Sequence, residues 1–256
     1  MNNMQQKKIF SIDKNNFKIE DLDLNFEFIS SNYKEKKTSF IDKNVITLKP
    51  LVMINVYLNL ISNYNLKNVV EFGIFEGAFQ IILPYMCSID KMVSIDLRNE
   101  SQEVIKILKE IKLQHRSKLY YNKNQSDTFS IPKIFSNEEL NNNVDLIIDD
   151  ASHLYHNSKR TFEITFPLLK NGGFYIIEDW NWAHNKTRPI APDLNNQIPL
   201  TKLLFDIIML QASEPTYITK VETLGPAQFL IQKGTAEFKY LNLDEQISSP
   251  KTLYFI

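Results

Sequence analysis

Four carboxylates that could act together in catalysis or metal binding come as two pairs in the second half of the chain. The pairs are Asp149-Asp150 and Glu178-Asp179. Each pair directly follows an apolar run, 144–148 for the first and 174–177 for the second, and such runs are typical of strands buried on both faces of a parallel sheet. Because neighbouring strands lie about 4.8 Å apart, the four carboxylates are expected to converge at one edge of the sheet.

Such a gathering of like charges raises the pKa of each carboxyl, and a bound cation removes that cost. Hard oxygen ligands suit Mg²⁺ or Ca²⁺, and Mn²⁺ is also compatible with them. His153, His156 and His184 lie close by in the sequence, and so do both tryptophans, Trp180 and Trp182. Taken singly, each of these residues reads as part of a solvated turn, a helix start or packing. The whole set at two strand ends favours a functional site.

A second group with chemical potential is the segment 71–77, Glu-Phe-Gly-Ile-Phe-Glu-Gly, which holds two of the six glycines. Glycine lets the backbone turn tightly and approach a ligand closely. Ligands of open α/β sheets bind beyond the carboxyl ends of the strands, and this segment follows an expected strand. Local packing could also explain a glycine turn. The dinucleotide pattern G-x-G-x-x-G is absent, which disfavours a nicotinamide-dependent oxidoreductase.

The order Glu71-x-Gly73-x-x-x-Gly77 resembles the first motif of class I S-adenosylmethionine-dependent methyltransferases. That family also places an acidic residue after the second strand, where Asp96 stands in this chain. The resemblance implies that the carboxylate of Asp96 accepts both ribose hydroxyls of S-adenosyl-L-methionine, although it could instead cap a helix. The family contacts adenine after the third strand, here at 125–127. The implied cofactor-binding residues are Glu71, Phe72, Gly73, Glu76, Gly77, Asp96, Gln125, Ser126, Asp127 and Asp149.

A narrower resemblance covers roughly residues 50–185. The segments 144–153 and 166–180 look like those of the metal-dependent macrolide-sugar O-methyltransferases and of the related cephalosporin hydroxylase-like family. This resemblance implies that Mg²⁺ (or Mn²⁺) is held by Asp150, Glu178 and Asp179. It also implies that His153 is the general base and that Asp150 acts with it in catalysis. Ala151 departs from the family, in which glycine is common at that position.

The predicted function is a metal-assisted O-methyltransferase that acts on a sugar hydroxyl, in a nucleotide-linked sugar or a surface glycan such as a capsule. Lys186 and Arg188 could contact a phosphate, or they could be ordinary solvated charges. A natural-product glycoside or a catechol-like molecule is an alternative acceptor, since both offer adjacent oxygens. A non-catalytic protein that binds the donor and assists another transferase is a further alternative, and the metal and base residues argue against it.

The composition of the chain restricts the partners and the cell compartment that we expect for the protein. The chain has 256 residues, 43% of them hydrophobic, and a formal net charge of −1. This balance gives no general attraction to nucleic acid or to an anionic membrane. The single cysteine, Cys87, suits a reducing compartment, and we find neither a secretory signal nor a membrane span in the sequence. We therefore expect a soluble, cytoplasmic protein, and the oligomers formed by relatives imply a homo-oligomer.

The alternation of apolar runs and amphipathic stretches predicts an α/β fold: a Rossmann-like, doubly wound and mainly parallel sheet of seven strands. The last strand should be antiparallel, because the short connection at 222–227 cannot make a parallel crossover. Residues 1–49 are expected to be a partly helical extension or cap, and residues 50–256 the methyltransferase domain. The expected strands are 68–72, 92–95, 118–121, 144–148, 174–177, 216–221 and 228–232. The expected helices are 51–61, 78–86, 102–113, 158–169 (ended by Asn171-Gly172-Gly173) and 200–211.

Overall fold

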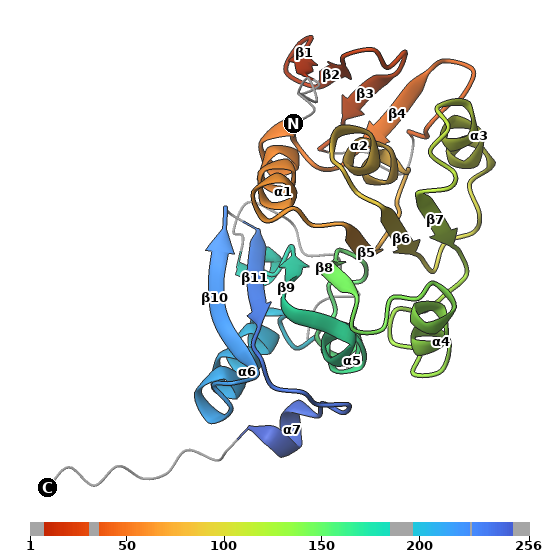
Figure 1. Ribbon diagram of the computed structural model, residues 1–256. Helices are drawn as coiled ribbons and strands as arrows, with labels where there is room; N and C mark the ends of the chain where they lie inside the picture. Colours follow the sequence, from red (N-terminus) through yellow and green to blue (C-terminus); the bar gives the residue numbers. More distant parts are fainter. Residues whose placement is uncertain (1–7, 31–35, 185–196, 226, 248–256) are drawn as a thin grey trace, which may run out of the picture. The chain divides into compact units, whose positions relative to one another are not determined.

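The computed structural model describes residues 8–30, 36–184, 197–225 and 227–247. The chain divides into two compact units, Met1–Asn124 and Gln125–Ile256. Each unit combines parallel strands with helices, as expected for the Rossmann-like α/β class (Figure 1). The domain boundary expected at 49/50 stays a prediction.

The first unit begins with a small four-stranded sheet. Its strands are β1 (Ile9–Ser11), β2 (Asn16–Ile19), β3 (Asn25–Phe28) and β4 (Asn44–Thr47). Strands β1, β2 and β3 pair antiparallel, and β4 pairs parallel with β3. The rings of Phe17 and Phe26 stack in its core with centroids 5.1 Å apart. The expected helical character of this segment is therefore wrong within its described residues.

The rest of the first unit alternates helices and strands in the predicted order. The elements are α1 (Leu51–Tyr64), β5 (Asn68–Phe72), α2 (Ala78–Met86), β6 (Lys91–Ile95), α3 (Gln102–Glu110) and β7 (Ser117–Tyr120). Strand β6 pairs parallel with both β5 and β7. Helix α1 ends where Asn65 adopts a left-handed conformation, and α3 begins where the Ser101 side chain accepts a hydrogen bond from the Val104 N–H.

The second unit contains the four remaining strands of the predicted seven. Its elements are α4 (Ser130–Asn137), β8 (Val144–Asp149), α5 (Tyr155–Thr165), β9 (Leu169–Glu178), α6 (Thr201–Ser213), β10 (Ile218–Leu224), β11 (Gln228–Lys233) and α7 (Leu243–Gln246). Short 3₁₀ helices span Phe166–Leu168 and Trp182–His184. Strand β9 runs parallel to β8, and β11 runs antiparallel to both β9 and β10. The predicted antiparallel last strand is confirmed.

The glycine pair that was expected to end a helix lies inside β9 instead. Helix α5 ends at Thr165, and a 3₁₀ turn containing Pro167 follows. Proline cannot donate a backbone hydrogen bond, so it does not continue the helix. The pairing with β8 shifts between Leu169 and Phe174, which marks residues 170–173 as an irregularity in the strand. The helix-stop interpretation of Asn171-Gly172-Gly173 is therefore wrong.

No helix among the described residues combines the length and the apolar character that crossing a lipid bilayer requires.

Candidate active site

In the first unit, the loop 73–77 leaves β5 beside the end of β6. Phe72 pairs with Ile95 in the parallel register, so Gly73 and Asp96 both follow the last paired residues of their strands. Gly73 has a φ of 103° and Gly77 a φ of 86°. These left-handed conformations favour glycine, which explains why the sequence has glycine at both positions.

The carboxylate of Asp96 fixes the shape of this loop. Its Oδ2 accepts hydrogen bonds from the N–H groups of Ile74 (2.7 Å) and Phe75 (3.2 Å), and its Oδ1 accepts one from the Arg98 N–H (2.8 Å). A carboxylate offers about four lone-pair sites, so further acceptor capacity remains. The predicted contact with ribose hydroxyls stays a prediction, and the loop-fixing role is one that the sequence did not reveal.

The two glutamates of the segment 71–77 are both buried and bound by other parts of the first unit. Glu71 accepts a hydrogen bond from the Gln80 amide, which also donates to Ser94 Oγ at 3.1 Å. Glu76 accepts from the Thr38 N–H at 3.0 Å and pairs with Arg98 at 2.9 Å. These contacts hold the loop and the preceding small sheet together. Direct contact of either glutamate with a cofactor remains a prediction.

Replacing Gly77 by alanine is expected to destabilise the protein strongly. The added Cβ would lie 2.5 Å from Val104 Cγ1, in a backbone conformation that costs an L residue about 1–2 kcal/mol. Overpacking of this kind adds about 1–3 kcal/mol. Gly172→Ala is the matched control, because its φ is similar (77°) and its Cβ would meet no atom within 4 Å. Urea denaturation should show a clearly larger loss of unfolding free energy for Gly77→Ala, and equal losses would contradict this steric explanation.

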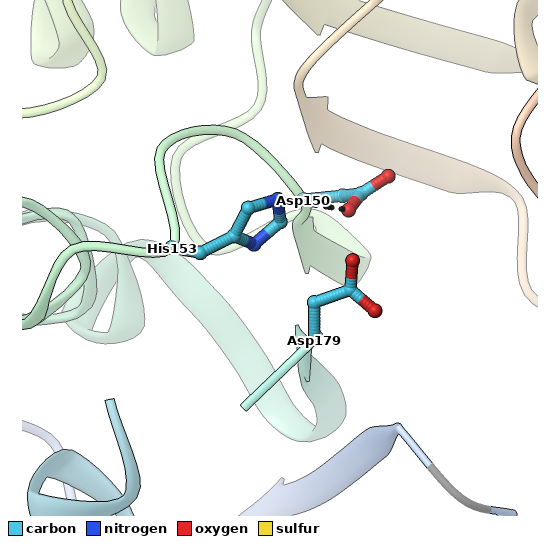
Figure 2. A group of neighbouring side chains, drawn as sticks. All are labelled: Asp150, His153 and Asp179. Atoms are coloured by element: carbon cyan, nitrogen blue, oxygen red, sulfur yellow. Dashed lines mark ion pairs between the residues drawn. The ribbon is translucent and has the colours of Figure 1, made fainter. Parts of the chain in front are cut away.

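In the second unit, Asp150, His153 and Asp179 come together beyond the ends of β8 and β9 (Figure 2). One ligand atom from each residue lies within 4.8 Å of the other two. The Nε2 atom of His153 lies 3.8 Å from Asp150 Oδ1. All three side chains are half-buried, so they are partly shielded from water and still reachable by a ligand. We call these three residues the acidic cluster.

Neighbouring groups restrict the conformations of the residues in the acidic cluster. The ring of Trp182 packs on that of His153, with centroids 4.3 Å apart. The Asp179 N–H donates to the Ala227 carbonyl at 2.8 Å, which fastens the end of β9 to the residue before β11. His153 and Asp179 adopt left-handed conformations, with φ of 55° and 54°. Non-glycine residues persist in such conformations where the surrounding structure holds them there.

The predicted metal ligands come together only in part. Asp150 and Asp179 belong to the acidic cluster, whereas Glu178 is buried and is not among the described residues that gather there. His153, predicted as the base, takes the third place. His156 is exposed and packs edge-on against Tyr155, and His184 lies 2.7 Å from the hydroxyl of Thr201. Lys186 and Arg188 lie outside the described residues.

Asp149 and Gln125, both predicted to bind the cofactor, are buried and bind each other. Gln125 Nε2 donates to Asp149 Oδ1 at 3.0 Å, and Gln125 Oε1 accepts from the Ser152 N–H at 3.0 Å. Burial raises the pKa of Asp149 to about 6, because water no longer stabilises the carboxylate. Through the hydrogen bond from the Ser152 N–H, the Gln125–Asp149 pair supports the turn between Asp150 and His153.

The predicted adenine contacts include a residue with a clear local role. Asp127 Oδ1 accepts from the N–H groups of Phe129 (2.9 Å) and Ser130 (3.0 Å), so it caps the start of α4. Ser126 is half-buried. Adenine binding by 125–127 stays a prediction, and α4 itself is a helix that the sequence reading missed although Asp127 was its capping signal.

Parts of this chain resemble known proteins. Residues 70–180 match the model of a family described as a methyltransferase domain. L-olivosyl-oleandolide 3-O-methyltransferase from Streptomyces antibioticus is 54% identical over 35 residues, which are 14% of this chain and 9% of that protein. Demethylmacrocin O-methyltransferase from Streptomyces fradiae is 33% identical over 72 residues, 26% of this chain and 18% of that protein.

The fold is also similar to that of a solved structure. The MycE methyltransferase from the mycinamycin biosynthetic pathway, solved in complex with Mg and SAH, superposes with a TM-score of 0.53 at 17% identity, over 73% of this chain and 51% of that one. This chain thus spans about half of the MycE chain and less than a fifth of the two relatives named above. The match to the methyltransferase-domain family, over residues 70–180, includes both the loop 73–77 and the acidic cluster, and the likeness to MycE is one of fold.

Proposed function

We propose that this chain is an S-adenosylmethionine-dependent O-methyltransferase that uses a divalent cation and acts on a sugar hydroxyl. The observation that carries the proposal is the acidic cluster within a matched methyltransferase domain. Two relatives that match short parts of the chain are named as O-methyltransferases, one of them for the glycosylated acceptor L-olivosyl-oleandolide, and this supports the choice of a sugar hydroxyl.

The donor is proposed to bind at the loop 73–77. Gly73 and Gly77, the left-handed glycines at the two ends of this loop, carry no Cβ, so the backbone at these two positions can approach a ligand closely. Asp96, directly after β6, accepts three backbone hydrogen bonds and keeps about one of its roughly four acceptor sites for a ribose hydroxyl. The loop is held in shape by its own unit, through Asp96 and Glu76, so it is prepared for a ligand before one arrives.

The acidic cluster fits a divalent cation. Its two carboxylates supply hard oxygen ligands, which are compatible with Mg²⁺ and Mn²⁺, and its imidazole stays available as a base. Asp150 and Asp179 are the proposed ligands, and Glu178, next to Asp179, remains a predicted one. When bound, such a cation would orient adjacent acceptor oxygens and make one of them easier to deprotonate.

His153 is proposed to accept the proton. The acceptor oxygen forms a bond to the methyl carbon while the carbon–sulfur bond breaks, and the bonding pair stays on sulfur. The hydroxyl proton passes to the imidazole, the side chain best suited to accept one near neutral pH. Trp182 packs against the His153 ring and limits its rotation, which helps to aim the base.

The acceptor is proposed to be a nucleotide-linked sugar or a surface-glycan sugar such as that of a capsule. A natural-product glycoside or a catechol-like molecule would offer the same pair of oxygens. That the protein forms a homo-oligomer and acts in the cytoplasm remains a prediction from the sequence.

A substrate screen tests the proposal. Nucleotide-sugars, glycosides and catechols are incubated with the protein, donor and Mg²⁺, and products are analysed by mass spectrometry. We expect a mass gain of one methyl group on a sugar. A gain on catechols alone would contradict the sugar assignment. Donor binding without transfer to any acceptor would support the alternative of a non-catalytic partner protein.

A further inference from the structure

Both loops of the acidic cluster are fastened to the first turns of one helix, α6. The loop after β9 is held by Thr201, the first residue of α6. Its hydroxyl donates to the Trp180 carbonyl at 3.2 Å and lies 2.7 Å from His184 Nε2. Trp180 directly follows Asp179 in the chain. The hydroxyl of Thr201 therefore restrains the backbone on which one carboxylate of the cluster sits.

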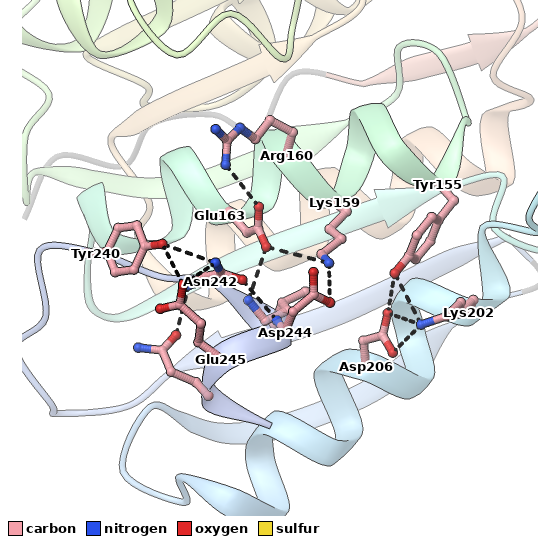
Figure 3. Close-up of polar contacts among 12 residues, drawn as sticks. Tyr155, Lys159, Arg160, Glu163, Lys202, Asp206, Tyr240, Asn242, Asp244 and Glu245 are labelled. Atoms are coloured by element: carbon pink, nitrogen blue, oxygen red, sulfur yellow. Dashed lines mark hydrogen bonds and ion pairs between the residues drawn. The ribbon is translucent and has the colours of Figure 1, made fainter. Parts of the chain in front are cut away.

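The loop after β8 is held by a buried polar group on the same helix (Figure 3). The Tyr155 hydroxyl donates to Asp206 Oδ2 at 2.8 Å and accepts from Lys202 Nζ at 3.2 Å. Lys202 also donates to both Asp206 oxygens at 2.8 Å. Tyr155 and Asp206 are buried, and hydrogen bonds to charged groups are among the strong ones. Tyr155 starts α5, two residues after His153, so this group restrains the position of the base.

The backbone of the acidic cluster requires such anchors. His153 and Asp179 both hold left-handed conformations, which relax unless neighbouring structure fixes them. Thr201 bonds to Trp180, the residue after Asp179, and Tyr155, which bonds to Asp206 of α6, lies two residues after His153. We propose that Thr201 and Tyr155 are positioning residues, which set the distance between the metal-binding carboxylates and the base. This inference rests on the proposed function, because it assigns the anchors to a cation site.

Thr201→Val tests the first anchor, since valine keeps the shape and removes the hydroxyl. The two tryptophans of the chain, Trp180 and Trp182, both lie in the loop that Thr201 holds. Quenching of tryptophan fluorescence by paramagnetic Mn²⁺ therefore reports binding at this loop without any turnover. We expect the Kd for Mn²⁺ to rise about tenfold, the lower end of the loss seen when a group that orients a metal ligand is removed, because Thr201 holds the backbone next to Asp179. Thr201→Ser, which keeps the hydroxyl, should restore the wild-type Kd.

Tyr155→Phe tests the second anchor. It also tests the proposal independently if circular dichroism shows that Thr201→Val does not fold. It removes only the hydroxyl and leaves the Lys202–Asp206 pair intact. We expect a fall in kcat of about tenfold with an unchanged KM for the donor, because the base is displaced while the donor loop is untouched. Thr219→Val on β10 is the matched control: its hydroxyl donates to the Gln232 carbonyl of β11 at 3.4 Å, away from both loops, and the substitution should alter neither value.

The outcomes separate this inference from the proposed function. Quenching of the wild-type protein together with an unchanged Kd in Thr201→Val and an unchanged kcat in Tyr155→Phe would overturn the positioning role alone. Absence of quenching in the wild-type protein would overturn the cation site itself and the anchors with it. A raised Kd that Thr201→Ser does not restore would show a general packing effect and would also overturn the proposal.

Discussion

His153→Ala is expected to lower kcat by about 10²–10⁴-fold, the usual contribution of a general base. The imidazole lies beside Asp150 and packs against the Trp182 ring, and imidazole is the side-chain type in the acidic cluster that most often serves as a general base. Donor affinity should change less than about twofold, because the donor is proposed to bind at 73–77, of which His153 is not part. Steady-state kinetics gives kcat, and calorimetry with S-adenosyl-L-methionine gives the affinity.

The control for this experiment is His156→Ala. His156 is exposed and lies outside the acidic cluster, although it is only three residues further along the chain. It should keep nearly full kcat. A strong loss of donor affinity in His153→Ala would contradict the assignment, since it would place His153 at the donor rather than at the acceptor hydroxyl.

Strands in the middle of the chain could be predicted because most of them contain a short run of apolar residues, such as Leu146-Ile147-Ile148 in β8. All six residues of β8 are buried, so the sequence itself carries the signal of a strand covered on both faces. The N-terminal sheet carries a weaker signal. In β2, buried Phe17 and Ile19 alternate with exposed Lys18, but four residues are too few to separate this period from chance.

The glycines of β9 show a limit of local signals. Asn-Gly-Gly after a helical stretch reads as a helix end, yet the helix had already ended before Pro167. What decides the outcome is long-range pairing with β8, which includes Leu169 and resumes at Phe174. A Cβ on Gly173 would lie 2.9 Å from Leu169 Cγ, so glycine is required there by packing within the strand irregularity.

The order of the strands was enough to predict that the two acidic pairs approach each other. It did not indicate which acid of each pair joins the acidic cluster. Asp149 pairs with Ile177, so regular continuation would place Asp150 beside Glu178. The left-handed backbone at Asp179 breaks the alternation of side chains, and Asp179 joins the cluster while Glu178 stays buried. The local sequence Glu-Asp-Trp does not indicate that left-handed conformation. The anchoring role of Thr201 was hidden for a related reason, since it depends on contacts across 21 residues.

Removal of divalent cations is expected to abolish turnover. Asp150 and Asp179 face each other across less than 4.8 Å, and a cation between them offsets their repulsion and activates the acceptor hydroxyl. Activity should vanish in EDTA and return with Mg²⁺ or Mn²⁺. Asp179→Asn, which removes one charge and keeps the shape, should raise the Mg²⁺ concentration for half-maximal rate at least about tenfold. The measurement is a titration of the chelator-treated protein with metal.

Asp244→Asn provides the matched control for Asp179→Asn. Asp244 is exposed on α7 and pairs with Lys159, a contact that contributes little to stability, so the same substitution there should leave the metal titration unchanged. Full activity in chelator would remove the cation from the mechanism. His153 would then have to deprotonate the acceptor unaided, and the two carboxylates would serve to orient the imidazole and the acceptor hydroxyls through hydrogen bonds. Under that outcome Asp179→Asn would raise the KM for the acceptor and leave no metal dependence to measure, which distinguishes the two mechanisms in one pair of titrations.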